Sequence, residues 1–145
     1  MSRMIFVNLP VSDLDRSIAF YEAVGAVKDI RFCDEDSAAM MSFSENVHVM
    51  LLTHARFQGF TTRTIIDAHK SAQALLALSA DEKADVDAIH DRAVRAGGTG
   101  DVNPVQDHGF MYGRAFADPD GHIWELVWMD VEAAMAAGQP EAINA

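Results

Sequence analysis

Residues 106–129 of the chain, QDHGFMYGRAFADPDGHIWELVWM, predict two strands joined by a tight turn. Aromatic and small residues fill the first strand, and the second, from residue 123 to 129, is strongly apolar. The DPDG sequence at 118–121 favours a turn, because proline presets φ, aspartate bonds to its own backbone and glycine accepts positive φ. Glu125 is the one carboxylate in the apolar strand, and burying an unpaired charge is costly. We therefore expect Glu125 to face water, a partner or a cavity.

Composition excludes several classes of function. The chain has 145 residues, half of them hydrophobic, and a formal net charge of −11. A hydrophobic content this high supports a folded core. Binding to nucleic acid or to an anionic membrane surface requires a basic surface, so we expect neither partner. No stretch approaches the roughly 20 apolar residues of a membrane span, and the N-terminal apolar run is too short for a signal peptide.

The single cysteine, Cys33, cannot form a disulfide within the chain, which is typical of a reducing compartment. It precedes the acidic residues 34–36, which disfavour a reactive thiolate. We therefore expect a cytoplasmic protein in which Cys33 has no catalytic role.

The pattern of secondary structure repeats once along the chain. In each half an apolar strand is followed by a helix that ends at glycine and by three more short strands. The predicted strands span 4–11, 27–32, 38–43 and 47–53 in the first half, and 73–80, 101–105, 110–117 and 123–129 in the second, with helices at 14–24 and 82–96. This repeat predicts an α+β fold of two βαβββ modules.

The two modules divide the chain as follows. The first covers 1–53, a polar linker covers 54–72, the second covers 73–130, and an alanine-rich tail, 131–145, can form one short helix before Gly138. Each module alone would bury too little surface to fold well. We therefore expect one compact domain in which the two sheets curl around a shared cavity.

Two stretches carry a resemblance to a known family. They are FVNLPVSDLDRSIAFYEAVGA, from Phe6 to Ala26, and FADPDGHIWELVWM, from Phe116 to Met129. Over about residues 4–130 the chain resembles the vicinal oxygen chelate superfamily, which includes glyoxalase I, bleomycin-resistance and fosfomycin-resistance proteins and extradiol dioxygenases. The resemblance implies a glyoxalase-like fold. It does not imply one reaction, because the fold hosts lyases, transferases, oxygenases and binding proteins.

Enzymes of this superfamily hold a divalent metal at four positions, which align here with Phe6, Leu51, Leu75 and Glu125. Only Glu125 is a metal-ligand type of residue. Divalent cations require several oxygen or imidazole ligands. The residues directly before and after Phe6, Leu51 and Leu75 are also apolar, so a shift of one position in the alignment supplies no ligand. The resemblance therefore implies a degenerate metal site. We predict no cofactor, although a divalent metal held by relocated ligands remains an alternative.

The alternation of side chains along strands suggests what surrounds Glu125. If Phe6 and Glu125 face the cavity, Asn8 does too. On the strand before Glu125, His108, Tyr112 and Arg114 share one parity. If that parity is inward, Arg114 can neutralise Glu125 or bind an anionic ligand, and Tyr112 and His108 can act as donors or acid–base groups. Alternatively, Arg114 and Glu125 form an ordinary cross-strand pair and the Tyr112 hydroxyl lies in water.

These residues define the predicted site. The ligand-binding set is Phe6, Asn8, Leu51, Leu75, His108, Tyr112, Arg114 and Glu125, and the catalytic candidates are Glu125, Tyr112 and His108. The remaining histidines carry less weight. We expect His48 outside the pocket, His90 on the surface and His122 in solvent.

Three hypotheses of function follow. The first is a bleomycin-resistance-like, metal-free protein that binds a small organic molecule as a homodimer. The second is a lyase or isomerase, similar to lactoylglutathione lyase, that acts on a small carbonyl compound or a thiol conjugate with Glu125 as base. The third is a divalent-metal-dependent enzyme with relocated ligands.

Overall fold

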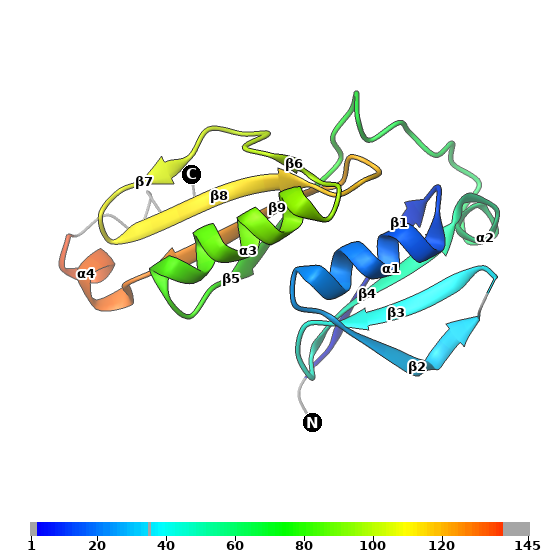
Figure 1. Cartoon of the computed structure of the whole chain (residues 1–145), viewed down its shortest axis with the longest axis horizontal. Helices are drawn as coiled ribbons and strands as arrows, with labels where there is room; N and C mark the ends of the chain where they lie inside the picture. The colour runs from blue at the N-terminus through cyan, green and yellow to red at the C-terminus, as the bar shows by residue number, and fades with distance from the viewer. Residues whose placement is uncertain (1–2, 35, 138–145) are drawn as a thin grey trace.

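A computed structural model describes residues 3–34 and 36–137. Two sheets lie end to end, and helices α1 and α3 cover the same side of both (Figure 1). The first sheet has the strand order β1-β4-β3-β2 and the second β5-β9-β8-β6, with β7 paired to β8. The predicted α+β class and the glyoxalase-like arrangement of two modules are confirmed.

The first module contains one helix and four strands: β1 (Ile5–Val11), α1 (Leu14–Ala23), β2 (Val27–Asp34), β3 (Ala38–Ser42) and β4 (Val47–Thr53). Helix α1 begins after Asp13, whose side chain accepts a hydrogen bond from the Arg16 backbone N–H. Strand β1 runs parallel to β4, and the two hairpins β2–β3 and β3–β4 are antiparallel.

The second module repeats this order after the short helix α2 (His54–Gln58): β5 (Leu75–Ser79), α3 (Lys83–Arg95), β6 (Thr99–Gly100), β7 (Gln106–Asp107), β8 (Met111–Ala117), β9 (Ile123–Met129) and α4 (Val131–Ala136). The strand predicted at 101–105 is wrong. Asp101 has a positive φ of 47° and Pro104 lacks an N–H, so only the flanking pairs β6 and β7 bond to β8. Residues 138–145 of the predicted tail lie outside the described residues.

The hydrophobic core fills the space between the helices and the sheets. Phe20 and Tyr21 of α1, Phe116 of β8 and Trp124 of β9 are all buried there. Aromatic contacts connect these side chains across the two modules, with Tyr21 and Trp124 rings 5.9 Å apart. The modules therefore share one core on their helical side.

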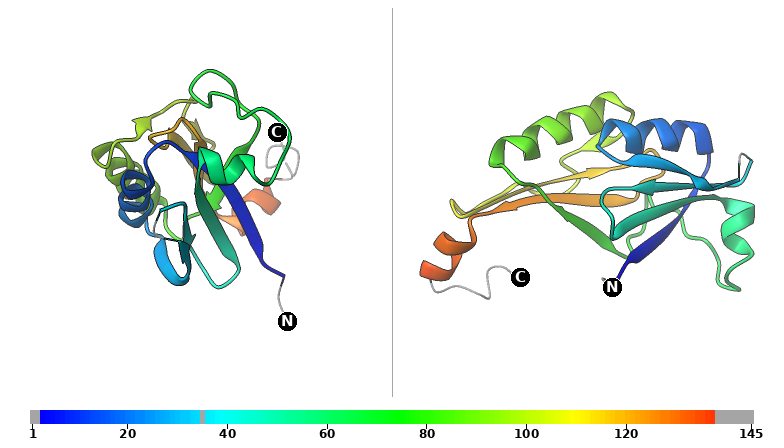
Figure 2. Two further views of the ribbon diagram at one scale, coloured as in Figure 1. Left: turned by 90° about the vertical axis from the view of Figure 1, so that its right-hand side faces the viewer. Right: turned by 90° about the horizontal axis from the view of Figure 1, so that it is seen from below.

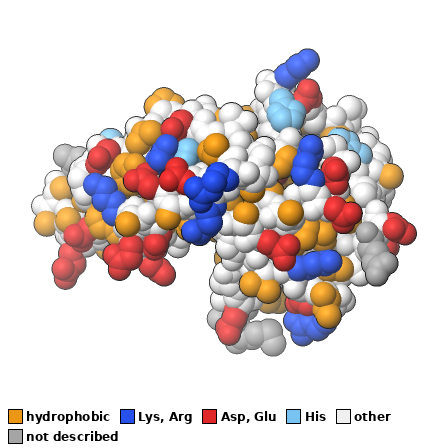
Figure 3. Space-filling view, viewed as in Figure 1, with side chains coloured by type: hydrophobic (Ala, Val, Ile, Leu, Met, Phe, Trp, Pro, Cys, Tyr) orange, Lys and Arg blue, Asp and Glu red, His pale blue; other side chains and the backbone are white. Residues whose placement is uncertain are grey.

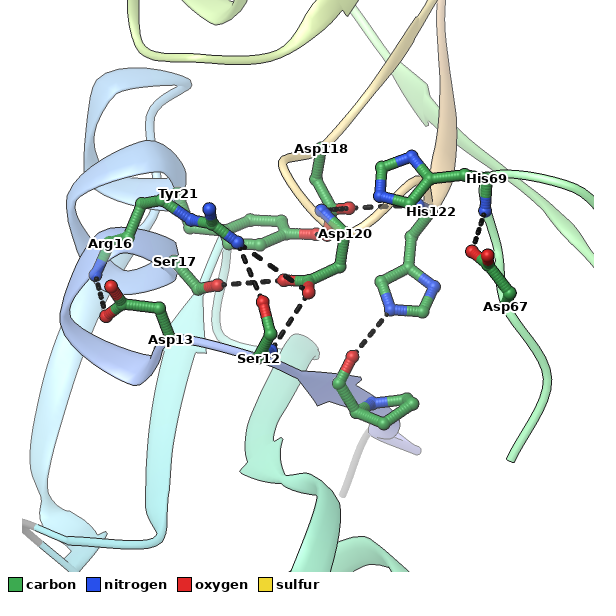
Figure 4. A network of polar contacts seen from close by, with 11 residues as sticks. Ser12, Asp13, Arg16, Ser17, Tyr21, Asp67, His69, Asp118, Asp120 and His122 are labelled. Atoms are coloured by element: carbon green, nitrogen blue, oxygen red, sulfur yellow. Dashed lines mark hydrogen bonds and ion pairs between the residues drawn. The ribbon is translucent and has the colours of Figure 1, made fainter. Parts of the chain in front are cut away.

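A buried hydrogen-bond network joins the modules at the DPDG turn (Figure 4). The Tyr21 hydroxyl donates to Asp118 at 2.6 Å and accepts from the Trp124 indole at 2.9 Å. Asp118 also accepts from the backbone N–H groups of Asp120 and His122. Burial, reinforced by the Asp118 charge, raises the pKa of Tyr21, and burial also raises the pKa of Asp118. Asp118 thus fixes the turn that begins β9 and anchors it to α1.

The side of the sheets opposite α1 and α3 is exposed along its edge strands but buried at its central strands, where Met40 and Ala115 are 4% and 2% exposed. Figure 2 shows α1 and α3 on one side, whereas α2 and α4 stand at the two ends of the other side. We call this other side the open face. Large apolar side chains there remain in solvent, and Leu75 is 52% exposed and Phe6 46% exposed. No helix within residues 3–34 and 36–137 is long and apolar enough to cross a membrane.

Candidate functional site: the open face around Glu125

Glu125 lies on the open face of the second sheet. Its neighbours on β9, Trp124 and Leu126, point to the opposite side and belong to the core. Strand alternation therefore places the Glu125 side chain away from the helices. Among the described residues, no hydrogen bond or ion pair holds its carboxylate. The apolar strand thus carries its one charge on the side that the fold leaves uncovered.

Small side chains flank Glu125 on the two neighbouring strands. In the sheet register it lies between Ala77 of β5 and Ala115 of β8. The same face of β8 also carries Gly113 opposite Val127 and Ala117 opposite Ile123. We call Ala77, Gly113, Ala115 and Ala117 the small-residue floor. The larger neighbours on this face, Ile123 and Val127, lie two residues away along β9, and Glu125 itself remains partly exposed.

The equivalent region of the first module is built differently. Phe6 lies opposite His48 in the sheet register, and the two rings stack with centroids 4.9 Å apart. The ring nitrogens of His48 contact the Ser42 hydroxyl at 2.7 Å and the Glu45 carbonyl at 3.0 Å. His48 is 7% exposed. The imidazole nitrogens are therefore occupied by protein groups. The expectation that His48 points away from the side that carries Phe6 is wrong, because the two rings stack.

The prediction that Leu51 lines the site is wrong. Leu51 is fully buried and packs in the core with Val49 and Met41. The side chains of β4 on the open face are His48, Met50 and Leu52, because they lie opposite Phe6, Asn8 and Pro10. Apart from His48, strand β4 is apolar on both faces before Thr53, so the polarity of one residue is all that its sequence offers to identify the open side.

The inward parity predicted for Tyr112 and Arg114 is also wrong. Ala115 lies opposite Glu125, whereas Arg114 lies opposite Leu126 on the helical side of the sheet. The Tyr112 hydroxyl and Arg114 both donate to Asp87 of α3, at 2.7 and 2.9 Å. Arg114 also binds Asp101 through two nitrogens. These two residues therefore form a polar cluster beside α3, separated from Glu125 by the sheet.

Charge pairing explains the ionisation of this cluster. Hydrogen bonds from Tyr112 and then Arg114 lower the pKa of Asp87, and a hydrogen bond from Arg114 lowers the pKa of Asp101. The same contacts raise the pKa of Arg114 and of Tyr112. All four groups keep their ordinary charge at neutral pH, as expected of a structural ion-pair network.

The histidines vary in their surroundings. His108 is exposed in the turn before β8, where its Nε2 lies 3.1 Å from the Gln106 side-chain oxygen. His122 is partly buried rather than solvated, and its Nε2 donates to the Pro10 carbonyl at 2.8 Å. His90, expected on the surface, is 3% exposed and accepts from the Asp101 N–H. None of these three rings hydrogen-bonds to Glu125.

The residues present do not fit a divalent metal at the family positions. Leu75 and Phe6 offer no ligand atom, and the nearest cross-strand neighbours of Glu125 are alanines. Within the described residues no group of three or more His, Cys, Asp or Glu side chains could hold a metal ion. A single carboxylate is not a complete site for such a cation.

A cavity of about 590 Å³ lies between the modules. It lies along the edge strands β1 and β5 and beneath the segment that joins α2 to β5. Asn8 lines it, as do Pro10, His122 and Ile123. Of the predicted site residues, therefore, Asn8 borders this cavity, whereas Phe6, Leu75 and Glu125 lie on open sheet faces.

The sequence and the fold together identify the family of this chain. Residues 3–126 match the glyoxalase/bleomycin resistance protein/dioxygenase superfamily. The match covers most of the chain, and the chain belongs to this superfamily. No curated protein matches the sequence.

Solved structures support the same fold. A hypothetical protein of S. aureus, SA1046, superposes with a TM-score of 0.73 at 23% identity, covering 88% of this chain and 94% of that one. The fosfomycin resistance protein FosX of Mesorhizobium loti gives 0.61 at 18%, covering 93% and 96%. TnmS3, an antibiotic-binding protein of Streptomyces sp. CB03234, gives 0.60 at 21%, covering 90% and 98%.

Proposed function

We propose that this protein binds a small organic molecule on the open face, without a metal, and that Glu125 is the polar anchor for the ligand. The observation behind the proposal is the unpaired Glu125 carboxylate on the small-residue floor. An unpaired carboxylate favours a cation or hydrogen-bond donor. The apolar residues Leu75, Ile123 and Val127 beside it favour an apolar body. The ligand class is therefore an apolar molecule with an amine or another donor group.

A second copy of the chain would enclose this ligand. Small-molecule sites are concave and bury most of their ligand, whereas the open face of one copy is exposed. The exposed Phe6 and Leu75 supply apolar surface for an intermolecular contact. Helices α2 and α4 stand at the two ends of this face (Figure 2). We propose a homodimer in which the open faces of two copies meet around the ligand.

The antibiotic-binding and resistance functions in the names of the family and its structural neighbours suggest first probes. Bleomycin carries a cationic end and extended aromatic groups, which suit Glu125 and its apolar surroundings. The test is calorimetric titration of bleomycin into protein treated with a chelator, with elemental analysis of the untreated protein. Saturable binding without metal is expected. A stoichiometric divalent metal in protein purified without added metal would contradict the proposal.

The same carboxylate favours one alternative, a lyase or isomerase with Glu125 as general base. An unpaired carboxylate on an accessible face can accept a proton from a bound substrate. Tyr112 and Arg114 cannot assist it directly, because they lie on the other face of the sheet. Turnover of the hemithioacetal of methylglyoxal and glutathione tests this function. Activity that survives Glu125→Gln would rule out the base role.

A further inference from the structure

The cavity between the modules has apolar walls. Val7, Leu9 and Leu76 from the edge strands lie on one side, and Phe57, Ile65 and Ile66 from the connecting segment lie on the other. Its volume of about 590 Å³ is in the range of small-molecule pockets, roughly 300–1,000 Å³. It extends along strand edges, whereas Glu125 projects from a sheet face. The two regions are therefore separate, although Ile123 borders both.

The roof of the cavity is the basic part of an acidic chain. Residues 54–73, which we call the strap, contain Arg56, Arg63 and Lys70 but only one acidic residue, Asp67. The whole chain has a formal net charge of −11. Distant surface charges are screened beyond about 10 Å at ordinary salt, so the local charge governs what binds beneath the strap. This local charge is positive.

Arg63 is the cation that lines the cavity. Arg56 is already engaged, because it contacts Asp34 and Ser37. Among the described residues, the Arg63 guanidinium has no hydrogen-bond or ion-pair partner. A guanidinium in this situation matches the two oxygens of a carboxylate.

The strap also holds the backbone of Arg63 in place. The Gln58 side chain donates to the carbonyls of Thr61 and Arg63, at 3.0 and 2.8 Å. Near its other end, the strap packs closely against the DPDG turn. A Cβ on Gly121 would lie 2.6 Å from the backbone nitrogen of His69. Both ends of the roof are thus fixed before any ligand arrives, which lowers the entropic cost of binding.

We propose that this cavity binds a small apolar carboxylic acid, with its hydrocarbon body between the strap and the edge strands and its carboxylate on Arg63. The His122 ring supports this arrangement. Its Nε2–H donates to the Pro10 carbonyl, which holds the ring at the wall of the cavity that it lines. The site is additional to the one around Glu125.

The experiment is calorimetric titration with octanoate and 4-phenylbutanoate, which share the carboxylate and differ in the body. Octyltrimethylammonium serves as the cationic control. Wild type is expected to bind at least one of the two acids. Its affinity for octyltrimethylammonium should be at least tenfold lower than its affinity for that acid. Arg63→Gln should weaken the acid at least fivefold, and Arg63→Lys should weaken it less. Ala74→Phe, a substitution at an exposed position that lines the cavity, should block the acid by filling the space.

Two control variants separate binding in this cavity from a general effect of charge and from binding at the open face. Arg95→Gln removes the same charge from the exposed end of α3 and should leave acid binding unchanged. Glu125→Gln should also leave it unchanged, so failure of the open-face proposal would not imply failure here. The inference is overturned if neither acid binds, or if an acid binds equally to wild type, Arg63→Gln and Ala74→Phe. Circular dichroism verifies that each variant is folded.

Discussion

The two modules have the same order of elements but opposite designs on their open faces. In the first, Phe6 stacks on His48, and both imidazole nitrogens contact protein groups. In the second, Glu125 stands between Ala77 and Ala115 with no partner among the described residues. On the first module's face, the polar ring of His48 has hydrogen-bond partners within the protein. On the second module's face, the Glu125 carboxylate has none among the described residues. Under the proposed function, the second module would supply the polar contact to the ligand and the first its apolar contact.

A second contrast exists within the second module itself. Carboxylates on the helical side of its sheet, Asp87 and Asp101, are paired with Arg114. The carboxylate on the open side, Glu125, has no such partner among the described residues. Figure 3 shows the helical side, where acidic side chains gather over the half of the molecule that contains α3 and cationic side chains lie among them. The carboxylates on the helical side are therefore paired within the fold, whereas the proposed function assigns the Glu125 carboxylate to a ligand.

The largest expected effect comes from separating the modules at their shared hydrogen-bond network. Asp118→Ala removes the acceptor of the Tyr21 hydroxyl and of two backbone N–H groups. Leaving such groups buried without partners should lower the free energy of unfolding by about 3–5 kcal/mol. Urea denaturation measures this, with Asp91→Ala on the exposed face of α3 as control. Equal stability of the two variants would mean that the network does not hold the modules together.

The next effect concerns Leu75, one of the four positions at which the family resemblance implies a metal ligand. Leu75 lies on the open face of β5, and its neighbour in register, Ile123, is two residues from Glu125. Leu75→His therefore places an imidazole on the same face as the carboxylate. We expect zinc affinity to rise about tenfold, or about 1.4 kcal/mol, by calorimetry. If Leu75→His and Arg95→His, at the exposed end of α3, gain equally, position 75 has no special relation to Glu125.

A smaller effect concerns the helical side. Arg114→Gln removes the partner of two partly exposed aspartates, and such pairs contribute roughly 1 kcal/mol or less. Their pKa values lie below the ordinary 3.8 in the folded protein, so the stabilisation is present above that pH and is lost as the pH falls through the lowered values. The stability difference between wild type and Arg114→Gln should therefore be greatest at neutral pH and shrink below about pH 4. A difference that grew on acidification would contradict the pairing.

The smallest effect is expected for the residue that we consider most important for function. Glu125→Gln keeps the shape of the side chain and breaks no hydrogen bond among the described residues. The free energy of unfolding should change by no more than about 0.5 kcal/mol. A loss above about 2 kcal/mol in urea denaturation would show that Glu125 has a structural partner, and the contrast with His48 of the first module would then disappear.

The sequence predicts the repeated fold because its signals are local. The DPDG turn, the Asp13 cap and the helix-ending glycines act through backbone geometry that neighbouring residues determine. The side of the sheet to which each strand residue points is harder to predict. Strand β4, VHVMLLT, is apolar on both sides, so its pattern allows Leu51 a surface position although the residue lies in the core. His48, the one polar residue of β4 before Thr53, is the signal that could have identified the open side.

The predicted facing of Arg114 and Tyr112 is wrong for a different reason. Their parity relative to Glu125 depends on the register between β8 and β9, which the residues of the turn determine and which a shift of one residue inverts. Their true partner, Asp87, is on α3, 25 residues from Tyr112 in sequence. The sequence shows the strap only as a polar linker, since the cavity beneath it depends on how the two modules are placed.

The most direct test of the functional claim is the dissociation constant of a ligand of the open face, measured for wild type, Glu125→Gln and the control Glu22→Gln on the exposed side of α1. Bleomycin is the first ligand to titrate. If the unpaired carboxylate is the anchor, Glu125→Gln should weaken binding at least tenfold, about 1.4 kcal/mol, while Glu22→Gln binds like wild type. Equal affinity in all three proteins would contradict the account.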